Sequence, residues 1–357
     1  MNNNYCIIMA GGIGSRFWPF SRNNKPKQFL DFFGSGKSLL QLTYERFRKL
    51  MPAEHIFIVS STIYKELILE QLPEITQRQV LLEPVRRNTA PCVAYAVNRI
   101  ASITDKANII VAPSDHLILN EGNFIETLEK GLKFAEKNDC LLTLGMNPTR
   151  PETGYGYIQI SEGEGNLRKV KTFTEKPNLE LAKVFLESGE FFWNAGIFLW
   201  SLQSIQSAFD HLLPEMAIKF KNGKEFYNTD KEQEFIDNIY PSCENISIDY
   251  GILEKADNVY VLCAEFGWSD LGTWGSLYEL APKDNQQNAA LKCKSKLYDC
   301  KDNIIVLPEN KLAVLQGLEG YIVVESDDVL LVCKKEEEQR IRQFVNDTAM
   351  SFKGDFI

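Results

Sequence analysis

The first part of the chain alternates between short apolar runs and stretches with a helical spacing of apolar residues. The apolar runs, each typical of a buried strand, are residues 5–10, 56–60, 80–83, 109–113 and 141–145. Between them, apolar side chains recur three or four positions apart, as Leu40, Tyr44, Phe47 and Met51 do, and the stretches 64–72 and 90–103 behave likewise. Strands that alternate with helices predict a Rossmann-like α/β fold, in which helices cover both faces of a mainly parallel sheet. Ligands of such sheets bind beyond the carboxyl ends of the strands.

The pattern changes twice further along the chain. Residues 155–161, 169–174 and 195–200 are predicted strands, whereas 179–188 and 202–222 are predicted helices, the second broken at Pro214. From residue 286 the apolar runs become short and are separated by Gly, Asn and Asp turns: 303–307, 312–315, 321–324 and 329–332. This spacing predicts a small all-β domain, either a β-helix or a sandwich, followed by a charged helix at about 335–346. We therefore expect a catalytic domain at 1–285 and a β-rich domain at 286–357.

Composition narrows the class of protein. The 357 residues carry a formal net charge of −9, which argues against nucleic acid as a partner, because phosphate backbones select basic surfaces. No apolar run approaches the roughly 20 residues that a membrane span needs, and the apolar start is too short for a signal peptide. The eight cysteines show no C-x-x-C pairing and are expected to be free thiols. The sequence therefore predicts a cytoplasmic protein with no membrane partner.

The charge is unevenly distributed. Between residues 1 and 30 there is no acidic residue, but there are four basic ones: Arg16, Arg22, Lys25 and Lys27. Three glycines lie in the same segment, directly after the first predicted strand: Gly11, Gly12 and Gly14. Glycines let a backbone approach a phosphate and present N–H groups to it, although glycines alone also suit a tight turn. With Arg16 and Lys27 nearby, the segment predicts a small anionic ligand.

Two familiar phosphate-binding motifs are excluded. The dinucleotide fingerprint G-x-G-x-x-G would need glycine at Phe17. The segment 34–38 ends like a P-loop, but that motif would need glycine at Asp31. We interpret 34–38 as a turn before a helix that Ser38 caps.

Two aspartates occupy positions where chemistry is expected. Asp115 follows the apolar run 109–113, and Asp270 lies in the aromatic and glycine-rich loop 267–272. Mg²⁺ bound to nucleotide phosphates needs only one or two protein carboxylates, because water and phosphate oxygens complete its shell. Taken singly, either aspartate is also typical of a helix cap or a turn.

Ordered motifs over nearly the whole chain resemble the mannose-1-phosphate guanylyltransferases, within the sugar nucleotidyltransferase superfamily. The motifs are Gly11-Gly12-x-Gly14-x-Arg16-x-x-Pro19, Pro26-Lys27-Gln28, Glu83-Pro84 with Arg87-Asn88-Thr89-Ala90-Pro91, Pro113-Ser114-Asp115-His116, Gly154-Tyr155-Gly156-Tyr157-Ile158, Phe173-Thr174-Glu175-Lys176-Pro177, Trp193-Asn194-Ala195-Gly196 and Trp268-Ser269-Asp270-Leu271-Gly272-Thr273-Trp274. The resemblance implies a nucleotide-diphospho-sugar transferase fold. It also implies transfer of GMP from GTP to α-D-mannose 1-phosphate, giving GDP-mannose and pyrophosphate with Mg²⁺ as cofactor.

The resemblance also implies a role for each matching residue. Nucleotide phosphates would be held by Gly11, Gly12, Gly14, Arg16 and Lys27. The guanine base would meet Glu83, Asn88 and Thr89, and Mg²⁺ would bind Asp115 and Asp270. The catalytic set would be Arg16, Lys27, Asp115 and Asp270. The sugar phosphate would contact Gly156, Glu175, Lys176, Asn194 and Asp249. Relatives often carry glycine where this chain has Arg86, so the resemblance leaves the geometry next to the base undetermined at this position.

Alternatives remain open at this stage. The same chemistry could act on another sugar 1-phosphate, such as a heptose or fucose with GTP, or glucose with another nucleotide, since one hydroxyl contact decides the sugar. A GT-A-type glycosyltransferase has a similar sheet but needs a D-x-D metal motif, for which Asp327-Asp328 in the β-rich region is a poor candidate. A non-catalytic nucleotide sensor would need degraded acids or lysines. Some relatives carry an additional cupin-type isomerase domain; we expect no mannose-6-phosphate isomerase activity here, and an exposed β domain would suit a homodimer.

Overall fold

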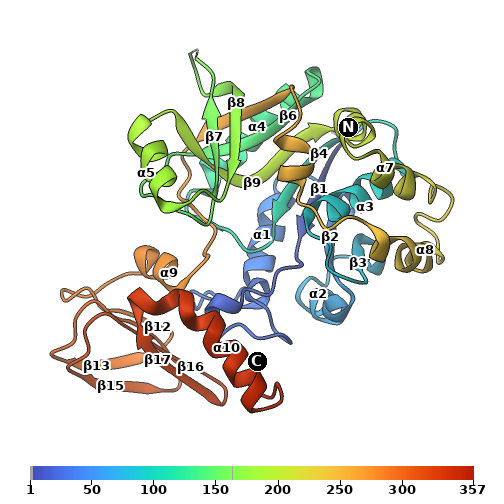
Figure 1. Cartoon of the computed structure of the whole chain (residues 1–357). Helices are drawn as coiled ribbons and strands as arrows, with labels where there is room; N and C mark the ends of the chain where they lie inside the picture. The colour runs from blue at the N-terminus through green and yellow to red at the C-terminus, as the bar shows by residue number, and fades with distance from the viewer. Residues whose placement is uncertain (1–2, 163) are drawn as a thin grey trace. The chain divides into compact units, whose positions relative to one another are not determined.

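The computed structural model describes residues 3–162 and 164–357, which form two compact units built from interleaved segments (Figure 1). The first, the sheet unit, comprises Met1–Gly11, Thr43–Ser114 and Ile118–Trp268. The second, the β-helix unit, comprises Gly12–Leu42, Asp115–Leu117 and Ser269–Ile357. None of the described helices is long and apolar enough to cross a membrane. All eight cysteines are free thiols, as expected.

The described residues of the sheet unit form a nine-stranded mixed sheet in the order β3-β2-β1-β4-β9-β6-β10-β8-β7. Its strands are β1 (Asn4–Met9), β2 (Ile56–Ser61), β3 (Val80–Glu83), β4 (Asn108–Pro113), β6 (Leu141–Met146), β7 (Gly156–Ile160), β8 (Leu167–Glu175), β9 (Phe191–Ser201) and β10 (Val259–Ala264). The first four strands pair in parallel, so the carboxyl ends of β1 and β4 lie at the same edge, with Met9 opposite Pro113. Strand β9 runs antiparallel between β4 and β6.

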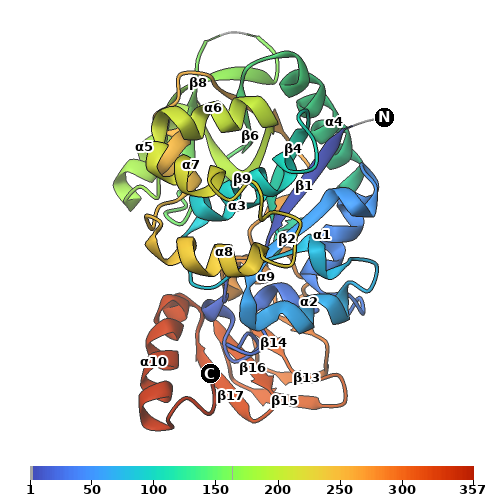
Figure 2. The ribbon, with the colours of Figure 1, turned by 90° about the vertical axis from the view of Figure 1, so that its right-hand side faces the viewer.

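Helices cover both faces of this sheet. On one face lie α3 (Thr89–Ala101), α6 (Leu202–Leu212) and α7 (Pro214–Lys221), which Figure 2 shows on the same side. Phe198 and Trp200 of β9 pack in the core beneath them. Leu199 points the other way, toward α4 (Glu121–Lys137), where a Cβ on Gly131 would lie 3.0 Å from it. Alternate side chains of one strand thus face helices on opposite sides of the sheet. A mixed sheet covered by helices on both faces confirms the predicted fold class.

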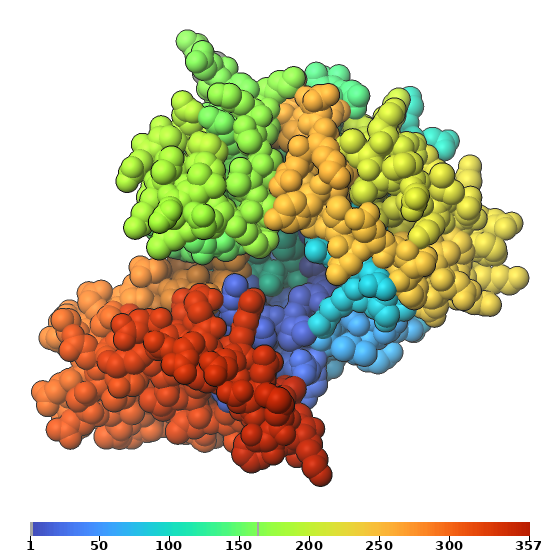
Figure 3. Space-filling view, viewed as in Figure 1, coloured from blue at the N-terminus to red at the C-terminus, as the bar shows by residue number. Residues whose placement is uncertain are grey.

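The β-helix unit winds its chain between two small sheets. One sheet contains β12 (Ala289–Leu291), β14 (Ile304–Val306), β16 (Tyr321–Ser326) and β17 (Val329–Lys334), and the other contains β13 (Lys294–Tyr298) and β15 (Leu312–Gln316). Except for the antiparallel β17, paired strands are two apart in the sequence and parallel, which decides for a β-helix over a sandwich. Figure 3 shows its orange surface continuing into the red surface of the C-terminal residues.

The remaining helices, strands and turns complete the two units. They are β5 (Leu117–Ile118), β11 (Trp268–Ser269), α1 (Leu39–Arg48), α2 (Lys65–Gln71), α5 (Leu179–Ser188), α8 (Glu232–Ile239), α9 (Trp274–Leu280), α10 (Ile341–Ser351), the 3-10 turns η1 (Ser15–Phe17), η2 (Lys27–Phe29), η3 (Ala53–His55), η4 (Thr62–Tyr64), η5 (Gln77–Gln79), η6 (Tyr240–Ser242) and η8 (Lys335–Arg340), and the π-helical turn η7 (Asp249–Leu253). Ser38 caps α1, as predicted, since its Oγ accepts the Gln41 N–H at 3.2 Å.

Most predicted elements are present, with two differences. The predicted helix 202–222 is indeed broken, because Pro214 begins α7. The prediction of a charged helix at 335–346 is wrong for its first half. There η8 makes 3-10 turns, and α10 begins only at Ile341. The strand expected at 195–200 extends over Phe191–Ser201. The domain limits 1–285 and 286–357 stay a prediction.

Candidate active site

The glycine loop of the β-helix unit is shaped by its contact with Lys27. Gly14 has a φ of +68°, and a Cβ placed on it would lie only 2.4 Å from the Cβ of Lys27. Two side chains hold the loop in place: Gln28 Nε2 donates to the Gly12 carbonyl at 3.0 Å, and Ser21 Oγ donates to the Ile13 carbonyl at 2.7 Å. Only glycine fits at position 14, because it alone adopts this conformation without strain and leaves room for the lysine.

Lys27 joins the two predicted metal-binding aspartates. The residue is only 4 % exposed, and its Nζ lies 2.9 Å from Asp115 Oδ2. The same Nζ donates to the backbone carbonyl of Asp270 at 2.5 Å. Burial alone would raise the pKa of Asp115, but the positive charges of Lys27 and His116 outweigh it and lower that pKa. Asp115 is therefore an ionised carboxylate at neutral pH.

These groups line one cavity of about 370 Å³ within the β-helix unit. Its walls include Gly14, Arg16, Lys27, Asp115 and Asp270, which come from three separate segments of the sequence. Arg342 from α10 also lines it, although the sequence did not single it out. The cavity is large enough for phosphate groups and carries both cations and carboxylates.

The loop that carries Asp270 folds back on its own carboxylate. The Gly272 N–H donates to Asp270 Oδ1 at 2.9 Å, and Leu271 has a φ of +45°. In the described part of the chain, no three metal-binding side chains cluster together. Two carboxylates on one cavity nevertheless fit Mg²⁺, which takes few protein ligands and completes its octahedron with water and phosphate oxygens.

In the sheet unit, Glu83 ends β3 as a buried carboxyl group. Burial raises its pKa to about 7, although the Tyr240 hydroxyl and Arg86 act in the opposite direction. Tyr240 donates its hydroxyl hydrogen to Glu83 Oε1. A Cβ on Gly11 would lie 3.2 Å from Glu83 Oε2, so this loop glycine borders the carboxyl group. Glu83 is thus a polar group held at a fixed place in an apolar setting.

Asn88 and Thr89 form the start of α3. Asn88 has a φ of +65° and accepts the Thr89 N–H through its side chain at 3.0 Å, so the capping interpretation holds. Thr89 Oγ1 accepts the Ile248 N–H at 2.9 Å, which ties the helix to the segment before Asp249. Arg86 is exposed. Burial raises the pKa of the nearby Tyr64, and the positive charge of Arg86 offsets part of this rise.

The predicted sugar-binding residues form a second group in the sheet unit. A Cβ on Gly156 would lie 2.5 Å from Glu175 Oε2 and 3.3 Å from the Cβ of Asn194. Glu175 pairs with the ammonium group of Lys176, and Asn194 Nδ2 donates to Asp249 Oδ1 at 2.9 Å. These contacts connect all five residues into one polar cluster, in which hydroxyl groups of a sugar would find both donors and acceptors.

Asp249 is the unusual member of this cluster. Burial raises its pKa to about 7, and the negative charge of Glu175 adds to the effect. Lys176 and the amide of Asn194 act in the opposite direction, but they do not outweigh it. The carboxyl group therefore changes protonation near neutral pH, unlike Asp115.

Comparison with known proteins identifies the family of the chain. The family model for nucleotidyl transferases matches residues 5–287, and a model named MannoseP isomerase/GMP-like beta-helix domain matches residues 299–347. The chain belongs to the nucleotidyl transferase family. It is therefore an enzyme, and the recognition made from its motifs is confirmed.

Individual relatives cover most of the chain. The mannose-1-phosphate guanylyltransferase RfbM of Salmonella typhimurium is 36 % identical over 352 residues, which are 95 % of this chain and 71 % of the relative. The mannose-1-phosphate guanylyltransferase of Salmonella montevideo is 36 % identical over 361 residues, 98 % of this chain and 75 % of its own. A solved structure from Thermus thermophilus, described as a mannose-1-phosphate geranyltransferase, has a TM-score of 0.88 at 29 % identity, covering 97 % of this chain and 99 % of that chain.

Within this nucleotidyl transferase the predicted site residues fall into two groups. The β-helix unit contains Gly12, Gly14, Arg16, Lys27, Asp115 and Asp270. The sheet unit contains Gly11, Glu83, Asn88, Thr89, Gly156, Glu175, Lys176, Asn194 and Asp249. Sequence reasoning missed Tyr240 and Arg342, because neither lies in a recognisable motif. Their contacts come from the tertiary structure alone, so the sequence held no signal for them.

Proposed function

We propose that this nucleotidyl transferase transfers GMP from GTP to α-D-mannose 1-phosphate, releasing pyrophosphate and giving GDP-mannose. The observation that carries the proposal is the cavity on which Arg16, Lys27, Asp115 and Asp270 converge. Relatives named mannose-1-phosphate guanylyltransferase, 36 % identical over nearly all of this chain, support the choice of substrates.

The reaction needs no general base. A phosphate monoester has its second pKa near ~6, so the attacking oxygen is already deprotonated at neutral pH. The obstacle is instead the repulsion between two anions and their alignment, which positioning and electrostatic stabilisation overcome. That requirement agrees with a cavity rich in fixed charges.

Each group of residues has a distinct task in this proposal. Asp115 and Asp270 would hold Mg²⁺, which supplies charge neutralisation of the phosphates when bound. Arg16 and Lys27 would bind the phosphates that leave as pyrophosphate. Glu83 would accept hydrogen bonds from the base. The cluster around Asn194 would orient the sugar 1-phosphate.

One alternative loses support from the contacts. A GT-A-type glycosyltransferase would need free acids in a metal motif, but Asp328 forms an ion pair with Arg22 at 2.5 Å between Oδ1 and Nη2. The identity of the sugar stays part of the proposal, as do the cytoplasmic location and the homodimer.

The test is a release assay for pyrophosphate. Each nucleoside triphosphate is combined with a panel of sugar 1-phosphates, including mannose, glucose, fucose and heptose derivatives, with and without Mg²⁺. We expect release only with GTP, mannose 1-phosphate and Mg²⁺ together. Faster release with another sugar would replace the proposed acceptor, and release without a sugar phosphate would contradict the transfer itself.

A further inference from the structure

The C-terminal helix α10 contributes a guanidinium group to the phosphate cavity. Arg342 lies in its first turn and lines the cavity together with Arg16 of η1. Both elements belong to the β-helix unit, and α10 packs directly against η1. Ile341, the residue before Arg342, is fully buried in the core of that unit, so the start of the helix is firmly anchored.

The two arginines form a cationic pair without an acid. Among the described residues, neither side chain has a hydrogen-bonding or ion-pair partner, and the Nε of Arg16 is buried. The positive charge of Arg16, and to a lesser extent burial, lower the pKa of Arg342, as expected for two neighbouring cations. Like charges at such a site repel each other unless an anion lies between them. Of the two acids of the cavity, Asp115 already pairs with Lys27, and Asp270 Oδ1 accepts the Gly272 N–H.

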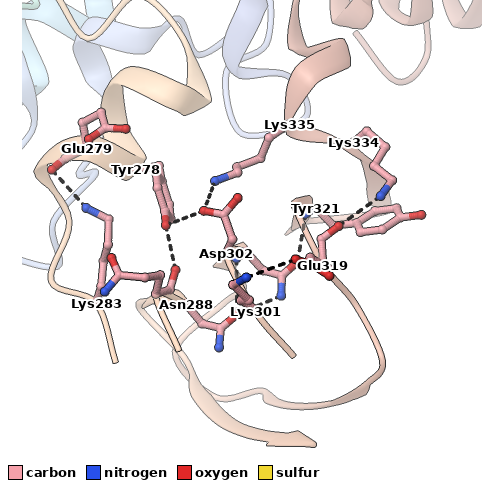
Figure 4. A network of polar contacts seen from close by, with 12 residues as sticks. Tyr278, Glu279, Lys283, Asn288, Lys301, Asp302, Glu319, Tyr321, Lys334 and Lys335 are labelled. Carbon is pink, nitrogen blue, oxygen red and sulfur yellow. Dashed lines mark hydrogen bonds and ion pairs between the residues drawn. The ribbon is translucent and has the colours of Figure 1, made fainter. Parts of the chain in front are cut away.

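A network of polar contacts fixes α10 relative to the Asp270 loop. The loop leads into α9, where Glu338 of η8 accepts the Gly275 N–H at 2.7 Å. One turn earlier, Lys335 Nζ lies 2.6 Å from Asp302 Oδ1, which also accepts the Tyr278 hydroxyl at 2.7 Å (Figure 4). Because η8 is held to α9 at these points, the residues that follow it are held as well. Arg342 thus occupies a preorganised position.

We propose that Arg342 binds the terminal phosphates of the nucleoside triphosphate together with Arg16. The proposal rests on the proposed function and adds a phosphate-binding residue from the C-terminal helix. In the reaction, a bond forms between the sugar phosphate oxygen and the α-phosphorus. The bond from that phosphorus to the bridging oxygen breaks, and this oxygen leaves with the electron pair as part of pyrophosphate. Arg342 stays protonated and donates hydrogen bonds to the leaving group, for which its planar fork is suited.

Titration calorimetry with inorganic pyrophosphate and Mg²⁺ tests the proposal on the full chain. Arg342→Ala should weaken pyrophosphate binding by about tenfold to a hundredfold, the usual effect of losing hydrogen bonds to a charged group. GMP, which lacks the terminal phosphates, should bind the variant as it binds the original protein. Arg342→Lys should recover part of the affinity, because it keeps the charge and loses the fork. Arg340→Ala is the matched control, since it removes the same charge from a residue that pairs with Glu337 at 2.8 Å.

Three outcomes would overturn the proposal. In the first, Arg342→Ala binds pyrophosphate as tightly as the original protein does. In the second, the variant loses as much affinity for GMP as for pyrophosphate. In the third, the original protein does not bind pyrophosphate. The proposed function is judged separately by the release assay on the original protein. If the protein transfers no GMP but still binds pyrophosphate in a way that depends on Arg342, the proposed phosphate-binding role of Arg342 stands. Only the proposed reaction is then wrong.

Discussion

At residue 14 the backbone conformation and the packing both demand glycine. A non-glycine residue in the left-handed region costs roughly 1–2 kcal/mol. The new methyl group would also lie 2.4 Å from Lys27 Cβ, an atom close to the backbone that cannot swing away. We expect Gly14→Ala to lower the free energy of unfolding by about 2 kcal/mol or more and to displace Lys27 from Asp115.

Gly12 provides the matched control for this prediction. A Cβ there has no neighbour within 4 Å, and Gly12 is absent from the residues with positive φ. Gly12→Ala should therefore leave the unfolding free energy within about 0.5 kcal/mol of the original. Denaturant unfolding followed by circular dichroism measures both variants. A similar small effect of the two substitutions would contradict the strain argument.

The two aspartates of the cavity differ in whether their side chains also stabilise the buried Lys27. Asp115→Asn would leave the buried Lys27 without its ion-pair partner, so its effect would mix stability with catalysis. Asp270→Asn is cleaner, because Lys27 binds the backbone carbonyl there and an amide oxygen can still accept the Gly272 N–H. We expect Asp270→Asn to reduce kcat by about 10²–10³ with an unchanged melting temperature. Normal turnover at saturating Mg²⁺ would remove Asp270 from the metal site.

Asp249 makes stability depend on pH in a predictable direction. Its pKa is raised to about 7 in the folded chain, compared with about 3.9 in an unfolded one. The folded state therefore binds the proton more tightly, and this stabilising contribution is lost as the pH rises through 7. Asp249→Asn removes the penalty of burying the charge. As the pH rises from 5 to 8, the free energy of unfolding of the variant should increase relative to that of the original protein by about 1 kcal/mol or more. The basis is about 1.4 kcal/mol per pKa unit.

Melting temperatures of both proteins at pH 5 and pH 8 give the measurement for Asp249. Asp105→Asn, on the exposed surface, serves as the control for a general effect of charge. The Asp249 prediction is wrong if the difference between variant and original protein is the same at both pH values.

At the scale of elements, the sequence was most informative where strands are buried on both faces. The runs at 5–10 and 109–113 are continuous in apolar residues because helices cover both sides of β1 and β4, and their observed limits differ from the predicted ones by one residue. Strand β13 was missed, since its residues are mostly exposed and mostly charged or polar. Where packing does not select apolar residues, the pattern carries little signal.

The candidate site was predictable to a similar degree. The glycine loop and the strand-end aspartates lie where βαβ topology places ligands, so their sequence positions are informative. Arg342 is different, because the chain folds through a whole β-helix before its side chain reaches the cavity of residues 12–17. No local pattern encodes such a return, and the charged stretch around it is typical of a solvated helix.

The contact between η8 and α9 stabilises the start of α9. Glu338 accepts the Gly275 N–H near the start of α9, where the partial positive charge of the helix favours a carboxylate. Glu338→Ala should lower the unfolding free energy by about 1.5–3 kcal/mol, the range for hydrogen bonds to charged groups. Glu336→Ala on the same turn is exposed and should have little effect. Equal melting temperatures for the two variants would show that the contact does not hold the turn.

The net charge of the whole molecule is opposite in sign to that of the cationic side chains in its phosphate cavity. The chain carries a net charge of −9, yet Arg16, Lys27 and Arg342 line one cavity within it. An acidic surface repels a triphosphate at long range, and salt screens this repulsion beyond roughly 10 Å. A nucleotide bound as its Mg²⁺ complex carries less negative charge, so the metal should assist both approach and binding.

Ligand binding to the folded state then provides a test on the intact chain. A ligand at 100 times its Kd stabilises the protein that binds it by about 2.7 kcal/mol. We expect GTP with Mg²⁺ to raise the melting temperature, and EDTA to remove most of that rise, because Asp115 and Asp270 would face the triphosphate without a cation between them. In Asp270→Asn the rise should be small with or without EDTA. ATP at the same concentration controls for general phosphate binding. If GTP protects the protein equally in EDTA, the two aspartates are not metal ligands, and the cationic side chains of the cavity bind the nucleotide by themselves.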